Sequence, residues 1–256
     1  MTPALNDPFA RLEGPLAGTT RMLLEVVANR ALTPSMQQVV LAAPELAGLR
    51  YRPGQDIMLM VAVDGDRPVR RRYTIAGLDT ARRLLTLGIV RHEGGPGERW
   101  VREARPGDQV EGIAPRGKIF PAGGAAWHLF AGDHSALPAF FAMAGSLAAG
   151  ERATVLLDVP GPGDEQELAA AADVRVAWLH RDGRPAGDPP ALAAAVADVP
   201  LPPGAGHAYL AGEARLVLAL RAALAARGMP DGQVSPKAYW GRGRANAAHG
   251  EPARDG

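Results

Sequence analysis

The four residues Arg71-Arg72-Tyr73-Thr74 combine positive charge, an aromatic ring and a hydroxyl group at the start of a predicted strand. Side chains alternate between the two faces of a strand, so we expect Arg71 and Tyr73 on one face and Thr74 on the other. On a shared face, a guanidinium can hold a phosphate while the ring stacks on a flat heterocycle, which suits a flavin nucleotide. Taken alone, these four residues are explained more simply by an edge strand with a solvated arginine and a half-buried tyrosine.

A glycine-rich segment, HEGGPGERW, runs from His92 to Trp100 and opens a predicted short helix. Glycines let backbone N–H groups approach a ligand, and the N-terminus of a helix attracts anions. A diphosphate is therefore the candidate ligand. A Gly/Pro hairpin without a ligand is an equally good interpretation of this segment alone.

Polar residues also follow two of the strands predicted in the second half of the chain. Asp133 and Ser135 lie where a strand ends and a helix begins, and Glu213 holds the same place after a later strand. Ligands bind at the carboxyl ends of strands in open parallel sheets, although capping of the next helix explains such residues equally well. Tyr239 and Trp240 adjoin a basic, glycine-rich loop, so both core packing and a surface binding role are open. The Gly-x-Gly-x-x-Gly fingerprint of an ordinary dinucleotide site is absent.

The composition excludes several other kinds of chemistry. The chain has no cysteine, which removes disulfides, thiolate nucleophiles, thiolate-bound zinc and cysteine-ligated iron–sulfur clusters. Its six histidines lack metal-ligand spacing, so we expect no metal site, and neither a Gly-x-Ser-x-Gly elbow nor a Gly-Lys-Ser/Thr phosphate loop occurs. A net charge of +1 argues against nucleic acid as a partner. The lack of a signal peptide and of an apolar run of roughly 18 residues predicts a soluble, cytoplasmic protein without a membrane segment.

The elements that must position these residues change character near residue 123. Between residues 21 and 120, short apolar runs alternate with Pro/Gly turns, a pattern typical of a small antiparallel barrel. From residue 124 onward, strand-like runs alternate with helical ones, which predicts a parallel sheet flanked by helices. The clearest helix begins at Ala214 and is stopped by Gly228. We therefore expect a β-barrel domain over residues 1–123 and an α/β domain over residues 124–256.

Taken in order, six segments resemble the siderophore-interacting protein family, the FAD-dependent ferric-siderophore reductases of the ferredoxin-reductase superfamily. They are RRYTIAG, RHEGGPGERWVREARPGDQVEGIAPRGK, AGDHSALPA, VAWLHRDGRPAG, YLAGEARLVLALRAAL and AYWGRGR, and they extend over nearly the whole chain. The resemblance implies an N-terminal FAD-binding barrel and a C-terminal parallel-sheet domain that binds NAD(P)H. It also implies that a hydride passes from NAD(P)H to FAD, and that single electrons then reduce a ferric siderophore and release Fe(II).

The same resemblance implies roles for individual residues. Arg71 would contact the flavin phosphates, Tyr73 would lie on the isoalloxazine, and Thr74 would hydrogen-bond the edge of the ring. The diphosphate and adenosine side would be lined by His92, Gly95, Pro96, Gly97, Glu98 and Trp100. Asp133, Ser135 and Ala136 would lie near the flavin ring and the nicotinamide, with Asp133 as the candidate catalytic residue. Glu213 would face the nicotinamide nucleotide, and Tyr239 and Trp240 would close over the flavin region.

Basic residues carry the remaining expectations. Arg181 follows the third strand of the second domain, where it can meet a 2′-phosphate or stay solvated, so the choice between NADH and NADPH is open. An anionic ferric siderophore would be bound by a basic patch, for which the candidates are Arg116, Lys118, Lys237, Arg242 and Arg244. We expect the protein to act as a monomer.

Three positions depart from the pattern of the family. Ala76 stands where a second arginine is frequent, and Gly241 also replaces an arginine. Glu98 replaces a small hydroxyl residue and would repel a diphosphate unless Arg99 or the helix end offsets its charge. Two alternatives therefore stay open. One is a reductase of the same fold that uses free flavin, a quinone or a redox protein as acceptor, and the other is a non-enzymatic siderophore-binding protein with impaired flavin binding.

Overall fold

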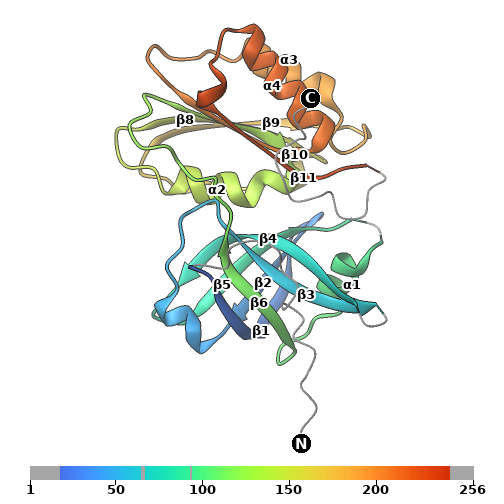
Figure 1. Ribbon diagram of the computed structural model, residues 1–256. Helices are drawn as coiled ribbons and strands as arrows, with labels where there is room; N and C mark the ends of the chain where they lie inside the picture. Colours follow the sequence, from blue (N-terminus) through green and yellow to red (C-terminus); the bar gives the residue numbers. More distant parts are fainter. Residues whose placement is uncertain (1–17, 65–66, 93, 243–256) are drawn as a thin grey trace, which may run out of the picture. The chain divides into compact units, whose positions relative to one another are not determined.

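The computed structural model describes residues 18–242 apart from residues 65, 66 and 93, and these form two compact units (Figure 1). The first unit contains the described residues up to Leu32 and those from Gln37 to Lys118. The second unit begins at Ile119 and also includes Thr33–Met36, the turn between the first two strands. The sequence placed the division after residue 123, and the structure places it after Lys118.

The first unit is a closed antiparallel barrel, which confirms the fold predicted from the apolar runs. Its strands follow one another around the barrel in the order β1-β2-β5-β4-β3-β6, and each predicted apolar run forms one of them. The strands are β1 (Thr20–Thr33), β2 (Met36–Ala42), β3 (Asp56–Asp64), β4 (Arg67–Asp79), β5 (Leu84–Val90) and β6 (Gln109–Arg116).

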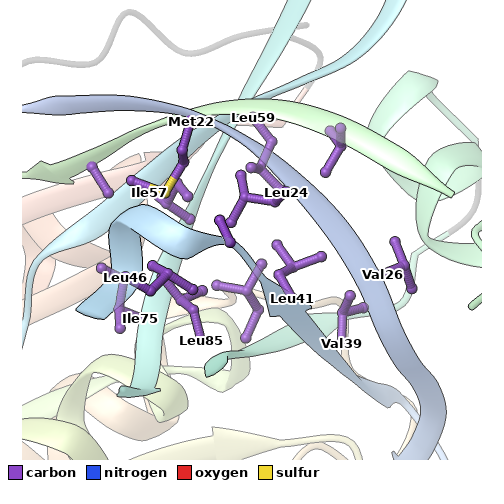
Figure 2. Packing of buried hydrophobic residues seen from close by; sticks show 14 of the residues in the cluster. Met22, Leu24, Val26, Val39, Leu41, Leu46, Ile57, Leu59, Ile75 and Leu85 are labelled. Atoms are coloured by element: carbon purple, nitrogen blue, oxygen red, sulfur yellow. The ribbon is translucent and has the colours of Figure 1, made fainter. Parts of the chain in front are cut away.

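Alternate residues of the strands fill the core of the barrel (Figure 2). Along β1, Met22, Leu24 and Val26 are buried, whereas the intervening Leu23 is 52% exposed. Figure 2 shows these buried side chains directed towards those of the other strands, such as Ile57 of β3. Each buried aliphatic side chain contributes about 1.5–3 kcal/mol, so this alternation fixes which residues of every strand face the core.

Helix α1 (Pro96–Glu103) packs on the barrel through its buried Val101. Asn29 of β1 holds the end of this helix, because its side-chain amide donates to the carbonyl oxygens of Val101 (2.7 Å) and Ala104 (2.9 Å). Carbonyl groups at the end of a helix lack a partner within the helix, and Asn29 supplies one. The helix is therefore anchored at its C-terminal end, which leaves its N-terminal end beside β4.

The second unit is a parallel sheet with helices on both faces, in the strand order β11-β10-β7-β8-β9 (Figure 1). The strands are β7 (His128–Asp133), β8 (Arg152–Val159), β9 (Asp173–His180), β10 (His207–Glu213) and β11 (Val234–Trp240). Helix α2 (Leu137–Gly145) covers one face, while α3 (Pro189–Asp198) and α4 (Ala214–Ala226) cover the other. The predicted strand–helix alternation is thereby confirmed. Short 3-10 turns are η1 (Pro44–Gly48), η2 (His134–Ala136), η3 (Pro162–Asp164) and η4 (Asp231–Gln233).

Two of the helices end where local chemistry requires it. Helix α2 ends at Gly145, where the Ser146 hydroxyl donates to the carbonyl oxygen of Met143 (2.7 Å) and competes with the helical pattern. Beyond α4, Gly228 has a φ of +78°, a left-handed conformation that suits glycine after a helix. Of the helices that the structure describes, none is both long and apolar enough to cross a membrane.

The parallel register brings the carboxyl ends of the strands to one edge of the sheet. Asp133 at the end of β7 lies opposite Asp158 on β8. At the end of β10, the register shifts after Gly212, so that Glu213 lies opposite Trp240 of β11. Ligands of open parallel sheets bind at this edge, and the polar residues of the second unit collect there.

Candidate functional site

Within the barrel unit, β4 carries Arg71 and Tyr73 on the core-facing side and Thr74 on the other side, opposite Asp56. The Arg71 guanidinium donates to the carbonyl oxygen of Arg70 (2.8 Å). Among the described residues, no carboxylate forms an ion pair with Arg71. A half-buried guanidinium without a counter-charge favours an anionic ligand, because charge-assisted hydrogen bonds to phosphate are strong.

The N-terminal end of α1 lies against Arg71 and Tyr73. Gly95 precedes the helix with a φ of +94°, and Pro96 takes one of the first helical positions. A side chain at Gly97 would come within 2.8 Å of the Tyr73 hydroxyl and 3.0 Å of Cγ of Arg71, so glycine is needed for this approach. The free N–H groups of the helix end and the Arg71 side chain therefore lie close together, an arrangement that fits the diphosphate of a dinucleotide.

Aromatic rings flank this end of the helix. Trp100 stacks on Tyr73, with ring centroids 6.0 Å apart and planes inclined by 24°. Burial raises the pKa of Tyr73 far above its ordinary value, so its phenol stays neutral and can donate a hydrogen bond. The exposed His92 ring is close to Gly95, since a Cβ on Gly95 would lie 3.9 Å from Cε1 of His92. The structure thus brings the predicted diphosphate-side residues of the barrel unit together at one end of α1.

The negative charge of Glu98, which replaces a small hydroxyl residue of the family and would repel a diphosphate, is offset by a neighbour on the same helix. Nη1 of Arg102 lies 3.1 Å from one Glu98 carboxylate oxygen and 3.4 Å from the other. This i,i+4 pair, rather than Arg99, offsets the negative charge. Both side chains line a hollow of about 290 Å³ beside the helix, together with Arg91 and Gln37.

Because the charge of Glu98 is already offset, Glu98→Gln is expected to change the dissociation constant of FAD by less than about threefold. Arg102→Gln leaves the carboxylate uncompensated near the diphosphate and is expected to weaken FAD binding about fivefold. The Glu98→Gln/Arg102→Gln double variant should recover wild-type affinity. Titration of the apoprotein with FAD, followed by quenching of flavin fluorescence, measures all three. A double variant as weak as Arg102→Gln alone would contradict this account of Glu98.

Arg72, next to Arg71 in the sequence, is held in an ion pair on the opposite face of β4. Its guanidinium binds both carboxylate oxygens of Asp56, at 2.8 and 2.5 Å, and Asp56 is only 3% exposed. Arg116 of β6 lies opposite Asp56 as well. Burial and the nearby charge of Arg72 lower the pKa of Arg116, and its buried Nε makes no hydrogen bond within the described residues. Arg72 therefore binds the Asp56 carboxylate, and Arg116 lies close enough to feel its charge.

In the second unit, the carboxyl edge of the sheet gathers the predicted residues around Asp133. Its carboxylate accepts hydrogen bonds from Ser135, from the backbone of Glu213 and from the indole of Trp240. Burial raises the pKa of Asp133, although these hydrogen bonds oppose the rise. Glu213 also caps α4, because its carboxylate accepts from the first amides of the helix (2.5 and 3.1 Å). Ala136 is buried at the end of η2.

A second acidic group, Asp158, lies at the same edge and has two arginine neighbours. Its carboxylate is 1% exposed and accepts no hydrogen bond from the described residues. Nε of Arg181 is 3.8 Å from one oxygen, and Nη2 of Arg184 is 3.7 Å from the other. Burial outweighs the attraction of these guanidiniums and raises the pKa of Asp158 to about 6, helped by repulsion from Asp133 and Asp188.

His134 is a further buried titratable group at this edge. It is 2% exposed, its Nδ1 is 3.2 Å from the Ser35 hydroxyl, and its Nε2 has no partner among the described residues. Ser35 donates in turn to Asp164 through its hydroxyl (2.8 Å) and its backbone amide (3.0 Å). Burial lowers the pKa of His134 to about 4, because repulsion from Arg181 adds to it while Asp164 opposes it only in part.

The shifted pKa values of Asp158 and His134 predict opposite pH dependences of stability between about pH 4 and pH 6.5. Folded Asp158 holds a proton that the unfolded chain releases, so it makes the protein less stable as the pH rises through this range. Unfolded histidine gains a proton that folded His134 refuses, so His134 makes the protein less stable as the pH falls. Each effect is on the order of 2–3 kcal/mol.

Because the effects of Asp158 and His134 oppose each other, removal of one group should reveal the pH dependence that the other causes. As the pH rises from 4.5 to 6.5, we expect the free energy of unfolding of Asp158→Asn to increase. Over the same interval, we expect the free energy of unfolding of His134→Gln to decrease. Urea unfolding at several pH values measures the free energy of unfolding of each variant. If both variants keep the pH dependence of the wild type, these two groups do not titrate as described.

The residues predicted to form a basic patch differ in their exposure and in their contacts. Lys118 is exposed at the end of the first unit, and Arg116 belongs to the ion cluster described above. In the second unit, the Lys237 ammonium lies 5.2 Å from the centroid of the half-buried Tyr239 ring. Arg242 donates to the carbonyl oxygen of Ala186 (2.6 Å). Arg244 lies outside the described residues.

Sequence reasoning missed three of the residues that define these sites. Asp158 ends a strand as Asp133 does, so the same rule could have identified it. Arg184 follows Arg181 in a tight turn, where its amide donates to the Arg181 carbonyl oxygen (2.9 Å). Asp56 carries no local signal, because its partner is across the hairpin. Within the described ranges, no group of three or more His, Asp or Glu residues could hold a metal ion.

Two family models match consecutive parts of the chain. The model described as the siderophore-interacting FAD-binding domain matches residues 57–119. The model described as siderophore-interacting protein matches residues 125–243. The first match contains β4 and α1 of the barrel unit, and the second contains the strand edge of the sheet unit.

Individual proteins and structures are similar over most of the chain. A solved structure of a siderophore utilization protein from T. fusca is 31% identical and has a TM-score of 0.80, covering 91% of this chain and 97% of that one. Ferric vibriobactin reductase ViuB of Vibrio cholerae is 29% identical, covering 90% of this chain and 92% of the relative. The NADPH-dependent ferric-chelate reductase of Escherichia coli is 27% identical, covering 69% of this chain and 68% of the relative.

Proposed function

Because this chain belongs to the siderophore-interacting protein family and contains its FAD-binding domain, we propose that it is an FAD-dependent ferric-siderophore reductase driven by NAD(P)H. The observation that carries the proposal is the half-buried Arg71, whose side-chain carbons lie against the N-terminal end of α1 and whose guanidinium has no carboxylate partner among the described residues. A cation and a helix N-terminus in one place favour a diphosphate over a neutral ligand.

The proposed reaction needs no nucleophile from the protein. Bound FAD would accept a hydride from NAD(P)H and deliver single electrons to the iron of the substrate. The residues of this chain would bind the cofactor and orient it. Arg71 and the amides around Gly97 would hold the diphosphate, the Tyr73 ring would lie along the isoalloxazine, and the Thr74 hydroxyl would hydrogen-bond its edge. Glu98, neutralised by Arg102, would not oppose this binding.

The nicotinamide nucleotide would bind at the carboxyl edge of the sheet, where Asp133, Ser135 and Glu213 are placed. Arg184 supports NADPH better than Arg181 does, because its side chain is 34% exposed whereas that of Arg181 is 10% exposed. A 2′-phosphate would give the Arg184 guanidinium an anionic partner closer than the carboxylate of Asp158, 3.7 Å away. NADPH is therefore the nucleotide that we propose.

The proposed substrate is an anionic ferric chelate, and Arg116 is the favoured residue of the barrel unit to attract it. Arg116 lies opposite Asp56, whose carboxylate Arg72 binds, so the three groups together retain one positive charge. The buried Nε of Arg116 lacks a hydrogen bond within the described residues. Anionic oxygen ligands hold Fe(III) far more tightly than Fe(II), so reduction alone would release the metal. Lys237 and Arg242 are candidates from the second unit.

An anaerobic assay with several electron acceptors tests this function. Holoprotein is supplied with NADPH or NADH and with ferric siderophores, free flavin or a quinone, and Fe(II) is trapped by a coloured chelator. We expect turnover with a ferric siderophore to exceed turnover with free flavin or the quinone. Rapid turnover of flavin or quinone without Fe(II) release would instead identify a reductase with a different acceptor.

A further inference from the structure

The carboxylate of Asp133 is fully occupied by hydrogen-bond donors of its own chain. Oδ1 accepts from the backbone amide of Ser135 (2.9 Å) and from the Ser135 hydroxyl (2.5 Å). Oδ2 accepts from the backbone amide of Glu213 (2.7 Å) and from the indole N–H of Trp240 (3.0 Å). A carboxylate offers about four acceptor positions, and here four donors take them. The group is also 2% exposed, so solvent has almost no access to it.

These donors belong to three segments that are far apart in the sequence. Ser135 lies in η2 after β7, Glu213 ends β10, and Trp240 ends β11. The register between β10 and β11 shifts at Gly212, next to the contact with Asp133. Gly212 has a φ of +135°, and a Cβ at this position would be 2.5 Å from Oδ2 of Asp133. Glycine therefore permits the approach that joins the three strand ends.

The Trp240 side chain is held on more than one side. Its indole N–H donates to Asp133, and a Cβ on Gly187 would come within 3.2 Å of Cζ2 on the ring. Gly187 has a φ of +70° and packs against Glu213 as well. Two residues further along, the backbone amide of Arg242 donates to Glu213 (3.3 Å). The ring is thus fixed in a half-buried position at the edge of the sheet.

From this geometry we infer that Asp133 is a positioning residue that fixes the Trp240 indole and the Gly212–Glu213 turn, and that it does not transfer a proton in the reaction. The inference rests on the proposed function for the importance of Trp240, which is expected to close over the flavin. It departs from the sequence-based expectation that Asp133 is catalytic, because all four acceptor positions of the carboxylate are taken.

Asp133→Asn tests the inference because an amide cannot replace this carboxylate. Each oxygen accepts from a backbone N–H, of Ser135 on one side and of Glu213 on the other. In either orientation, the side-chain NH₂ of asparagine would therefore face another donor. Because one backbone N–H then opposes the NH₂ group, the side chain is displaced and the Trp240 indole N–H should be held less firmly. Asp231→Asn is the matched control, since Asp231 is an exposed partner of Arg221 (2.9 Å) away from this edge.

The primary readout is the indole N–H signal of Trp240 in the ¹H–¹⁵N spectrum of the whole apoprotein, assigned by its disappearance in Trp240→Phe. We expect hydrogen exchange of this group to be at least tenfold faster in Asp133→Asn and unchanged in Asp231→Asn. An indole signal with unchanged shift and exchange in Asp133→Asn would overturn the inference. Because this readout uses neither cofactor nor turnover, it can fail or succeed independently of the proposed function.

Kinetics of the holoprotein distinguish positioning from proton transfer. Positioning predicts that Asp133→Asn and Trp240→Phe each lower kcat about tenfold, and that the double variant stays within threefold of the slower single variant. The pH profile of kcat should keep its shape in both. If Asp133 transferred a proton, Asp133→Asn alone would remove one limb of that profile, and the effects would multiply in the double variant. Should Asp133→Asn fail to fold, Trp240→Phe still tests the inference, since unchanged kcat in that variant would contradict it.

Discussion

Replacement of Arg71 by alanine is expected to give a folded protein that is purified without its yellow cofactor. Among the described residues, the guanidinium makes one hydrogen bond, to the carbonyl oxygen of Arg70, so its removal leaves no buried carboxylate of this part of the chain uncompensated. What is lost is a charge-assisted contact to the flavin diphosphate, worth about 2–3 kcal/mol. The dissociation constant of FAD should therefore rise about 30- to 150-fold. Flavin titration of the apoprotein measures this change, and urea unfolding should show a loss below about 1 kcal/mol.

Arg71→Lys is the graded control for this prediction. Lysine keeps the positive charge but lacks the planar fork that matches two phosphate oxygens, so its affinity should fall between those of alanine and arginine. An Arg71→Ala protein that retains wild-type FAD content would show that the diphosphate lies elsewhere. It would remove the main structural support for the proposed flavin site.

The neighbouring substitution, Arg72→Ala, is expected to have the opposite profile. Arg72 binds both oxygens of Asp56, which is 3% exposed, and its removal leaves this carboxylate without its bidentate partner. Breaking a buried pair from one side costs about 3–5 kcal/mol, and Arg116 nearby should limit the loss to about 3 kcal/mol. The melting temperature should fall by about 6–12 °C. FAD affinity of the folded fraction should change less than threefold.

The double variant Asp56→Leu/Arg72→Met separates charge from packing. Replacing both members of a buried ion pair by apolar residues of similar size is often nearly neutral, but Arg116 would lose the same carboxylate, so only part of the lost stability should return. Calorimetry and FAD titration on the same preparations give both quantities. If Arg72→Ala lost FAD as severely as Arg71→Ala while remaining stable, the assignment of these two arginines would have to be exchanged.

The contrast between Arg71 and Arg72 shows how far the sequence alone could be interpreted. Alternation along the strand correctly placed Arg71 with Tyr73, but it could not reveal which arginine has a counter-charge. That depends on Asp56, which is brought opposite Thr74 only by the register of the β3–β4 hairpin. The barrel itself was predictable, because its apolar runs and Pro/Gly turns are local signals.

Local contacts could be predicted from the sequence, whereas contacts between distant segments could not. The Glu98–Arg102 pair has the i,i+4 spacing that favours ion pairs on a helix, so it could have been predicted. The four hydrogen bonds that the Asp133 carboxylate accepts could not have been predicted, because their donors come from residues 135, 213 and 240. Their distance in sequence hides a contact that depends on three strand ends and on Gly212.

The central claim, an FAD-dependent reductase that acts on ferric siderophores, is tested most directly by the visible spectrum of the purified protein under anaerobic conditions. We predict a bound-flavin band that bleaches when NADPH or NADH is added and returns when a ferric siderophore is supplied, with Fe(II) released. A colourless protein that takes up no added FAD, or a flavin band that NAD(P)H does not bleach, would contradict the claim.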